Sequence, residues 1–225
     1  MQLRQLLADF VLFNSSRYHL EQWLRGIAEE IDGKEVVVLD AGAGSGAYRH
    51  VFDHVSYESA DFAKVDKTYD KNLTYICSLE HIPVADQYFD RIVCTQVFEH
   101  LPEPTAVLTE FRRVIKPGGF IHASAPLFYE EHEVPYDFFR YTQFGWRRMA
   151  DSAGLEVVEV DWLEGYYGTL AYQMQTAARA LPKGLLPLRA VFALLAGLFA
   201  RADVKNKRTD LGMPKNYRVT LRAAY

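Results

Sequence analysis

A chain of 225 residues and 25.8 kDa has the size of one large α/β domain, and its 49% hydrophobic and 24% charged residues are ordinary for a globular protein. This composition excludes collagen-like, low-complexity and wholly disordered chains. The net charge of −4 at pH 7 and the sequence pI near 6.0 argue against a general nucleic-acid binder, which is normally strongly basic.

The first two predicted elements are helices over residues 2–13 and 16–31, where apolar residues recur at three- and four-residue steps. A run of β-branched residues at 36–39 then predicts a strand buried on both faces, as in a parallel sheet. Further strands are expected at 56–60, 73–77, 89–95, 119–124, 156–162 and 217–223. Helices are expected between them at 103–115 and 142–153. This alternation predicts βαβ units and a mostly parallel sheet.

Residues 165–213 do not fit the alternation. Two strongly apolar helices, at 169–181 and 185–200, precede the last strand, and we interpret the segment as an insertion before that strand. We therefore expect a single domain over residues 1–225, with N-terminal helices at 1–33, a core at 35–162, the helical insertion at 165–213 and the last strand at 217–223.

The strand predicted at residues 36–39 runs directly into a glycine loop. The sequence of residues 36–46 is VVVLDAGAGSG, and we expect a helix after it. Glycines at positions 42, 44 and 46 allow a ligand to pack against the main chain, beside the amides of that helix N-terminus. The dinucleotide fingerprint is G-x-G-x-x-G, whereas here the spacing is G-x-G-x-G and Asp40 lies two residues before the first glycine. A carboxylate at that position favours a cationic ligand over a pyrophosphate.

The loop resembles motif I of the class I methyltransferases, which depend on S-adenosylmethionine (SAM). SAM carries a sulfonium and an ammonium group and has no phosphate, in keeping with the acid before the glycines. The resemblance extends over about residues 35–125 and is carried, in family order, by YESAD at 57–61, ICSLEHIP at 76–83, QYFDRIVCTQVFEHL at 87–101 and RRVIKPGG at 112–119. It implies a Rossmann-like, doubly wound α/β fold with a seven-stranded, mostly parallel sheet, whose last strand is antiparallel and follows a helical insertion.

The resemblance also implies which residues form the cofactor site: Asp40, Ala41, Gly42, Gly44, Gly46, Asp61, Ser78, Leu79 and Gln96. Asp61 would accept hydrogen bonds from both ribose hydroxyls, and Asp66 is a weaker candidate for that role. Asp40 would orient the cofactor's ammonium, or else cap the helix after the loop. Ser78 stands where many family members carry an aspartate for the adenine amino group. Gln96 either lies between cofactor and substrate or is only a polar strand terminus.

Residues 125–141 are too aromatic and too charged for an ordinary connector. They follow the fifth strand at the carboxyl edge of the sheet, the side on which ligands bind in doubly wound folds. Aromatic faces there can cover the sulfonium or stack on a substrate. The candidate substrate residues are Phe128, Glu131, Tyr136, Arg140 and Tyr141. Two plainer alternatives stay open: a solvated acidic surface loop, and an Arg140 that only pairs with Asp137.

Two histidines are candidates for chemistry. His132 lies between Glu131 and Glu133, whose carboxylates would raise its pKa and suit it to act as a general base. His100 resembles a position that the family uses to brace the turn after strand four, so we weigh bracing against catalysis. Methyl transfer depends mainly on alignment, and a base is needed only where the acceptor must lose a proton. No metal ion is expected.

Positive charge is concentrated at the C-terminal end of the chain. Residues 182–225 hold nine basic and two acidic residues, a net +7, which leaves −11 for residues 1–181. The apolar stretch at 185–200 is shorter than the roughly 20 residues that span a bilayer. Three interpretations compete: a buried lid or homodimer helix, a cover over a hydrophobic substrate, and a helix that lies on anionic lipid with help from basic residues up to position 208.

The sequence gives weaker indications of the cellular localisation of the protein. Cys77 and Cys94 fit no disulfide or metal motif and are expected to be buried thiols. The apolar residues 6–13 are interrupted by Asp9, and no cleavage site follows, so no signal peptide is expected. We expect a cytoplasmic protein, with peripheral membrane contact through residues 185–208 as an open possibility.

We therefore expect a SAM-dependent methyltransferase that acts on a small-molecule acceptor, more readily at oxygen than at nitrogen, and releases S-adenosylhomocysteine. A hydrophobic or lipid-associated acceptor follows if the 185–208 segment contacts lipid or substrate. The acidic body disfavours nucleic acid as a substrate, although the basic tail leaves it open, as protein substrates are. The alternatives are a SAM-binding protein that transfers nothing, a membrane-associated scaffold, and a NAD(P)-dependent oxidoreductase, which Asp40 and the glycine spacing disfavour.

Overall fold

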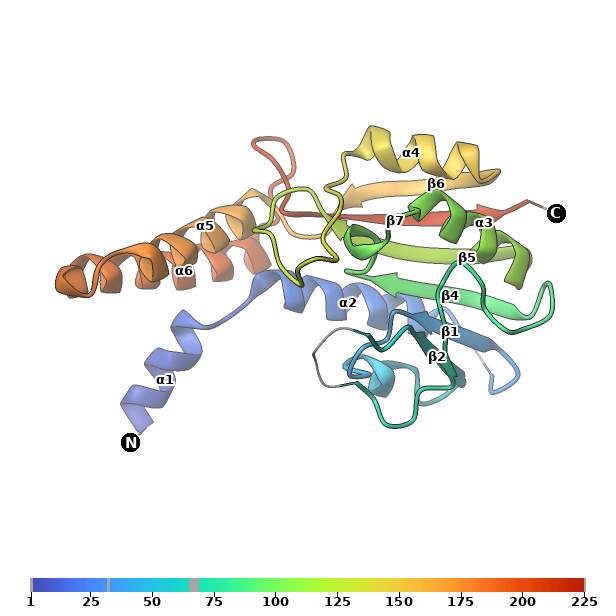
Figure 1. Ribbon diagram of the computed structural model, residues 1–225. Helices are drawn as coiled ribbons and strands as arrows, with labels where there is room; N and C mark the ends of the chain where they lie inside the picture. The colour runs from blue at the N-terminus through green and yellow to red at the C-terminus, as the bar shows by residue number, and fades with distance from the viewer. Residues whose placement is uncertain (1, 32, 65–68, 225) are drawn as a thin grey trace. The chain divides into compact units, whose positions relative to one another are not determined.

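The computed structural model describes residues 2–31, 33–64 and 69–224 (Figure 1). The chain divides into two compact units. One contains residues 1–22 and 162–216, and the other contains residues 23–161 and 217–225. The N-terminal residues and the helical insertion, which are far apart in the sequence, thus belong to the same unit.

The larger unit is built on a seven-stranded sheet in the order β3-β2-β1-β4-β5-β7-β6. The strands are β1 (Val37–Ala41), β2 (Ser56–Asp61), β3 (Tyr75–Ile76), β4 (Phe89–Thr95), β5 (Ile115–Pro126), β6 (Leu155–Trp162) and β7 (Asn216–Ala223). The first five strands pair in parallel, and β7 runs in the opposite direction to its neighbours in Figure 1. The expected fold class is confirmed.

The core of this unit lies on the central strands. β1 lies between β2 and β4, and Val38 and Leu39 are completely buried, as a β-branched run in a parallel sheet predicts. Helix α3 (Pro104–Val114) buries its one apolar face, including Leu108 and Phe111. Helix α4 (Gln143–Ser152) begins at Thr142, whose side chain accepts a hydrogen bond from the Gly145 amide.

The helix expected directly after the glycine loop does not form. In its place the chain makes turns and one 3-10 helix, η1 (Arg49–Phe52). Gly44 and Gly46 both have positive φ angles, which interrupt a right-handed helix before it can begin. The amides that the loop can offer a ligand therefore belong to turns and not to a helix N-terminus. The prediction of a helix N-terminus at this place is wrong.

Two strands differ from the expected ranges by more than one or two residues in length. β3 is only two residues long, and β5 begins at Ile115 instead of residue 119. Ile115 pairs with Phe89, and the register then shifts before Arg91 pairs with Phe120. Gly118, with a φ of 75°, absorbs this bulge, so the Pro-Gly-Gly sequence at 117–119, which precedes most of the expected strand, lies inside β5.

The smaller unit is helical. It contains α1 (Gln2–Val11), the first part of α2 (Ser15–Glu29), α5 (Tyr166–Ala180), the 3-10 helix η3 (Lys183–Leu185) and α6 (Leu186–Lys205). α6 packs along α5 and also contacts α1. A Cβ atom at Gly197 of α6 would lie 2.6 Å from the ring of Phe10, so glycine is what allows the close contact with α1. Arg201 donates to the Phe10 carbonyl at 2.7 Å and lies over its ring.

Candidate functional site

The glycine loop leaves β1 between its two neighbours, β2 and β4, which is where the strand order of a doubly wound sheet reverses and ligands bind. The amides of Gly42 and Ala43 both donate to the Ala60 carbonyl, at 2.7 and 3.2 Å. Gly42 has a φ of 78°, and a Cβ atom there would lie 2.3 Å from Cγ2 of Val97. The sequence requires glycine at this position for close packing inside the protein.

Gly44 differs from Gly42 in what it faces. Its φ is 53°, and no protein atom lies within 4 Å of the place where a Cβ would be. On its far side the loop is held by Asp70, whose amide donates to the Gly44 carbonyl at 2.8 Å and whose carboxylate accepts from Arg49 Nε at 3.1 Å. Asp70 and Arg49 were not identified from the sequence, because their pairing depends on the fold of the loop.

Asp40 is a buried carboxylate at the end of β1, only 6% exposed. Its Oδ2 accepts a hydrogen bond from the hydroxyl of Tyr57 on β2 at 2.6 Å. Burial raises the pKa of Asp40 to about 6, against the opposing effect of the Tyr57 hydrogen bond and with a further increase from the nearby Asp61 charge. Because no α-helix follows the loop, the alternative role of Asp40 as its cap is wrong.

Asp61 ends β2 and is 4% exposed. Its Oδ2 accepts from the Gly44 amide at 3.0 Å, and its Oδ1 accepts from the Ala63 amide at 2.9 Å. The carboxylate therefore fixes the glycine loop, and each oxygen keeps a second lone pair for a ligand. The weaker candidate, Asp66, lies outside the described residues.

Ser78 and Leu79 lie in the turn after β3. The Ser78 hydroxyl accepts from the Glu80 amide at 3.3 Å, and its carbonyl accepts from the His81 amide at 3.1 Å. Ser78 is exposed and Leu79 is buried. Ser78 thus shapes the turn, and its contact with an adenine stays a prediction.

This turn region is anchored to α3. The Ile82 amide donates to Glu110 at 2.7 Å, and Arg113 donates to the carbonyls of Ile82 and Val84, both at 3.0 Å. Arg113 also pairs with Glu110 at 2.7 Å. These contacts give a structural reason for Arg113 before the Pro-Gly-Gly sequence: it holds the segment that follows Ser78 and Leu79.

Gln96 follows β4 with a φ of 57°, which is unusual for a residue other than glycine. Its amide donates to the Ser124 carbonyl at 2.8 Å, and its side-chain Nε2 donates to the Ser124 hydroxyl at 3.1 Å. The strained backbone is held by β5. Strained positions of this kind collect at functional sites, which supports Gln96 as more than a strand terminus.

Tyr141 is a core residue. It is 5% exposed, its hydroxyl donates to the Phe98 carbonyl at 2.8 Å, and its ring lies 5.1 Å from that of the buried Trp146. The expected contact between Tyr141 and a substrate is therefore not supported by the geometry. At this position the aromatic pattern reflects core packing beneath the loop. From sequence alone, such a pattern cannot be distinguished from an aromatic binding surface.

Arg140 organises its own loop. Its guanidinium donates to both carboxylate oxygens of Asp137, at 2.6 and 2.8 Å, and also to the carbonyls of Tyr129 and Glu130. This bidentate pair is the plainer of the two alternatives for Arg140. An anionic substrate would have to compete with Asp137 for it.

Three expected substrate residues remain near the loop surface. Phe128 and Glu131 are exposed, and Tyr136 is half-buried with its ring edge-on to Phe62 at 5.7 Å. No described contact conflicts with a substrate at these positions, and they stay predictions.

His132 is paired differently from the way its neighbours in sequence suggest. Its Nδ1 lies 3.3 Å from a carboxylate oxygen of Asp137 and 3.2 Å from the Glu130 carbonyl, while Glu133 reaches toward His100 instead, at 3.9 Å. The role of Glu131 and Glu133 as its carboxylate partners is therefore corrected: Asp137, five residues along the chain, takes that place because the loop turns back on itself.

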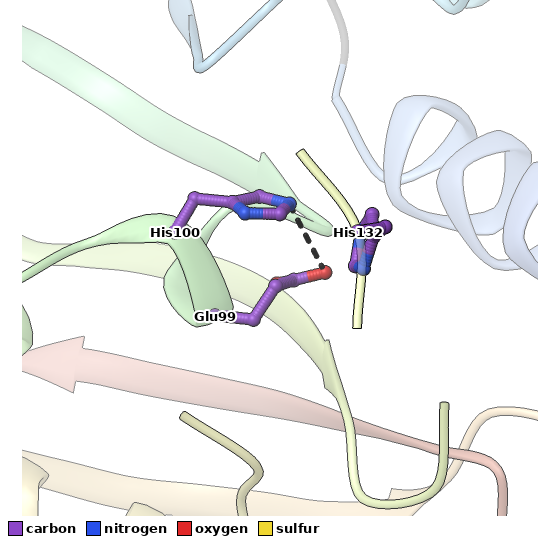
Figure 2. A group of neighbouring side chains, drawn as sticks. All are labelled: Glu99, His100 and His132. Carbon is purple, nitrogen blue, oxygen red and sulfur yellow. Dashed lines mark ion pairs between the residues drawn. The ribbon is translucent and has the colours of Figure 1, made fainter. Parts of the chain in front are cut away.

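His100 and Glu99 belong to the 3-10 helix η2 (Phe98–His100), directly after β4. The Nδ1 of His100 donates to the Tyr136 carbonyl, so His100 does brace the loop after β5 against this turn. Burial lowers the pKa of His100, and burial raises the pKa of Glu99 to about 8. In Figure 2 the side chains of Glu99, His100 and His132 converge. The sequence drew attention to both histidines but not to Glu99.

The comparisons with known proteins agree with this geometry. Residues 39–123 match the sequence profile of a family described as Methyltransferase domain. A tRNA U34 carboxymethyltransferase from Nautilia profundicola is 30% identical over 94 residues, which cover 36% of this chain and 31% of that protein. A ubiquinone biosynthesis O-methyltransferase from Paracidovorax citrulli is 27% identical over 118 residues, which cover 45% of this chain and 47% of that protein.

Among solved structures, one chain of the complex between the Haloferax volcanii Trm112 methyltransferase activator and its methyltransferase is similar, with a TM-score of 0.62 and 20% identity. The match covers 99% of this chain and 96% of that one, and it shows the fold. The matched segments make up less than half of the length of either curated relative described above.

Proposed function

We propose that the chain is a class I SAM-dependent methyltransferase that transfers the methyl group of SAM to an oxygen of a small, hydrophobic or lipid-associated acceptor. The observation that carries the proposal is the glycine loop between β1 and β4, flanked by two buried carboxylates, Asp40 and Asp61. The loop supplies close backbone approach, and the carboxylates supply negative charge for a cationic ligand.

The charge of the site favours SAM over a dinucleotide. A pyrophosphate would meet the carboxylates of Asp40 and Asp61 at a loop that does not lead into an α-helix, so the usual helix dipole would not help to bind it. A sulfonium and an ammonium gain from the same carboxylates. A thermal-shift comparison of SAM with NADH tests this choice: stabilisation by NADH alone would favour the oxidoreductase alternative.

The choice of oxygen as the acceptor atom is the more specific part of the proposal. It draws support from the similarity to the ubiquinone biosynthesis O-methyltransferase and from the histidines at the carboxyl edge of the sheet, which can receive or direct a hydroxyl proton. Formation of S-adenosylhomocysteine with phenolic acceptors, against matched anilines, tests it. A protein that binds SAM but gives no product with any acceptor would be the non-transferring alternative.

The ribose assignment is tested by Asp61→Ala. Loss of a buried carboxylate that holds the Gly44 amide should weaken SAM binding by about 1–3 kcal/mol, or roughly ten- to a hundredfold. Glu58→Ala is the matched control, since Glu58 lies on the same strand but pairs with Tyr75 and Tyr88. Calorimetry should show SAM affinity unchanged in the control; equal affinity in both variants would refute the assignment.

A second proposal concerns where the protein works. α6 is longer than the apolar stretch expected from the sequence, and Lys183–Lys205 is long and apolar enough to cross a membrane by length and composition alone. Its small residues, among them Ala196 and Ala200, are buried, whereas large aliphatic side chains are exposed. Those exposed on α6 are Leu186, Leu188, Val191, Leu194 and Leu198.

This distribution is the reverse of that in an ordinary soluble helix, which buries its large aliphatic residues. Exposed Lys183 and Lys205 lie near the two ends of the helix, where anionic headgroups would meet both if the helix lay along a membrane surface. We therefore propose that the protein is cytoplasmic and binds anionic membranes peripherally through α6, which would bring it to hydrophobic acceptors.

Vesicle co-sedimentation tests the membrane proposal. Replacing Leu186, Leu194 and Leu198 together by glutamate should reduce binding to phosphatidylglycerol-containing vesicles by more than about tenfold, since each leucine contributes about 1.5–3 kcal/mol when buried in lipid. Phe144→Glu, at a 73% exposed position on α4, should leave binding unchanged. A different outcome would assign α6 to a homodimer interface: the wild-type protein would not bind vesicles but would form a dimer, and the triple variant would be a monomer.

A further inference from the structure

Glu99, His100 and His132 form a side-chain cluster that the cofactor site does not use. Each offers one ligand atom, and these atoms all lie within 4.8 Å of one another (Figure 2). Glu99 and His100 come from η2 after β4, and His132 comes from the loop after β5, so the cluster lies at the carboxyl ends of two adjacent parallel strands. Doubly wound folds bind their ligands on this side of the sheet.

Glu99 carries an unsatisfied polar atom in this cluster. The residue is 1% exposed, and its Oε2 is buried without a hydrogen-bond partner among the described residues. A buried carboxylate oxygen without a partner is costly, and native proteins seldom keep one without an ion, water or reaction that uses it. Its other oxygen, Oε1, lies 3.9 Å from Nε2 of His100.

Each imidazole is held through its Nδ1 atom. His100 donates its Nδ1 proton to the Tyr136 carbonyl, which leaves the lone pair on Nε2, the atom that faces Glu99. The Nδ1 of His132 is held by the Asp137 carboxylate and the Glu130 carbonyl, which likewise leaves Nε2 as the basic nitrogen. A carbonyl or carboxylate behind each ligand histidine is the usual support of a metal site.

We propose that Glu99, His100 and His132 bind one divalent transition-metal ion of the zinc type. Two imidazoles and one carboxylate are a donor set that zinc takes in catalytic sites, where a further position stays open for water or substrate. Donor atoms about 2 Å from one tetrahedral ion lie roughly 3.4 Å apart. The cluster's ligand atoms, 3.9 Å apart for His100 and Glu99 and all within 4.8 Å of one another, would therefore move closer together when the ion binds. No metal ion was expected from the sequence, and two adjacent ligands with a third in a distant loop match no standard metal-site spacing.

If the proposed methyl transfer is right, the ion also has a role in it. An acceptor hydroxyl bound at the open position would have a lowered pKa and release its proton to water. The resulting oxygen anion would form a bond to the methyl carbon as the carbon–sulfur bond breaks, giving the methyl ether and neutral S-adenosylhomocysteine. This role rests on the proposed function, whereas binding of the ion does not.

Metal binding by the purified full chain tests the inference. After treatment with a chelator and its removal, titration with Zn²⁺ should show about one site per chain, and Co²⁺ should give the visible absorption of a low-coordinate site. His132→Ala and Glu99→Gln should each weaken Zn²⁺ binding at least about tenfold, since loss of even a supporting residue has that effect. His81→Ala, at an exposed histidine outside the cluster, is the control.

Two measurements keep the outcome clear. Because Glu99 is buried, the melting temperature of each metal-free variant shows whether it is folded, and His132 in its half-exposed loop gives a variant independent of the core. SAM affinity, measured in the same samples, separates failure of this inference from failure of the proposed function. A wild-type protein that binds no Zn²⁺, or a His132→Ala variant that binds it as well as His81→Ala does, would overturn the inference.

Discussion

Replacing Gly44 by alanine is expected to weaken SAM binding by more than about tenfold, or 1.4 kcal/mol, with only a modest loss of stability. A Cβ at Gly44 would meet no protein atom within 4 Å, so the new methyl group would point into the space that the cofactor needs. The left-handed φ of 53° adds a strain of about 1–2 kcal/mol for alanine, which the folded protein can tolerate.

Gly42→Ala is expected to act mainly on stability instead of on SAM binding. Its Cβ would lie 2.3 Å from Cγ2 of Val97, so this variant should lose about 2–5 kcal/mol of unfolding free energy from combined strain and overpacking. A Val97→Ala change in the same chain should restore part of that stability, because it removes the two closest atoms.

Denaturant unfolding and calorimetry on the same preparations distinguish the two glycines. Each variant is the control of the other, since both add one methyl group at a left-handed position of the same loop. If Gly44→Ala binds SAM like the wild type, the cofactor does not lie over this loop, and the proposed site is lost with it.

Asp40→Asn is expected to make the protein more stable at pH 7 while weakening SAM binding. The pKa of Asp40 is raised by burial to about 6 from 3.8, so between about pH 4 and pH 6 the folded state holds more protons than the unfolded state. Stability therefore falls as the pH rises through this window, by up to roughly 3 kcal/mol at about 1.4 kcal/mol per pKa unit. Asparagine carries no charge and avoids this loss.

The gain in stability for Asp40→Asn should thus be about 1–3 kcal/mol at pH 7 and should shrink toward pH 4, where the wild-type carboxyl is protonated. SAM affinity of the wild type should fall below about pH 6, because a cationic ligand favours the ionised carboxylate, and the variant should lack this dependence. Tyr57→Phe provides a matched change: loss of its hydrogen bond should move the pH window of Asp40 upward.

Unfolding curves between pH 4 and pH 8, together with calorimetry at the same pH values, check both signs. A stabilising substitution that damages binding marks a residue kept for function at a cost in stability. If Asp40→Asn were destabilising at pH 7 and bound SAM normally, Asp40 would be a structural residue that holds Tyr57.

The sequence alone determined the parts of this protein that depend on local pattern. The bounds of β4, Phe89–Thr95, are those that its hydrophobic run predicts, and the alternation of strands and helices predicted the mostly parallel sheet. The antiparallel last strand was expected from the family resemblance. Alternate glycines after a buried strand, with an acid before them, carried the resemblance to the methyltransferase family and predicted the position of the cofactor loop. These signals lie within a few residues of one another, where spacing and side-chain type fix the backbone.

The tertiary structure decided what depends on residues that are distant in the sequence. Only the fold places Tyr57 against Asp40, buries Tyr141 and gives His132 the Asp137 carboxylate instead of those of its neighbours in sequence. Only the fold brings His132 to Glu99 and His100, because a loop's path depends on contacts made across the sheet. Local pattern carries no information about such contacts, so the donors that surround a reacting atom could be read only from the structure.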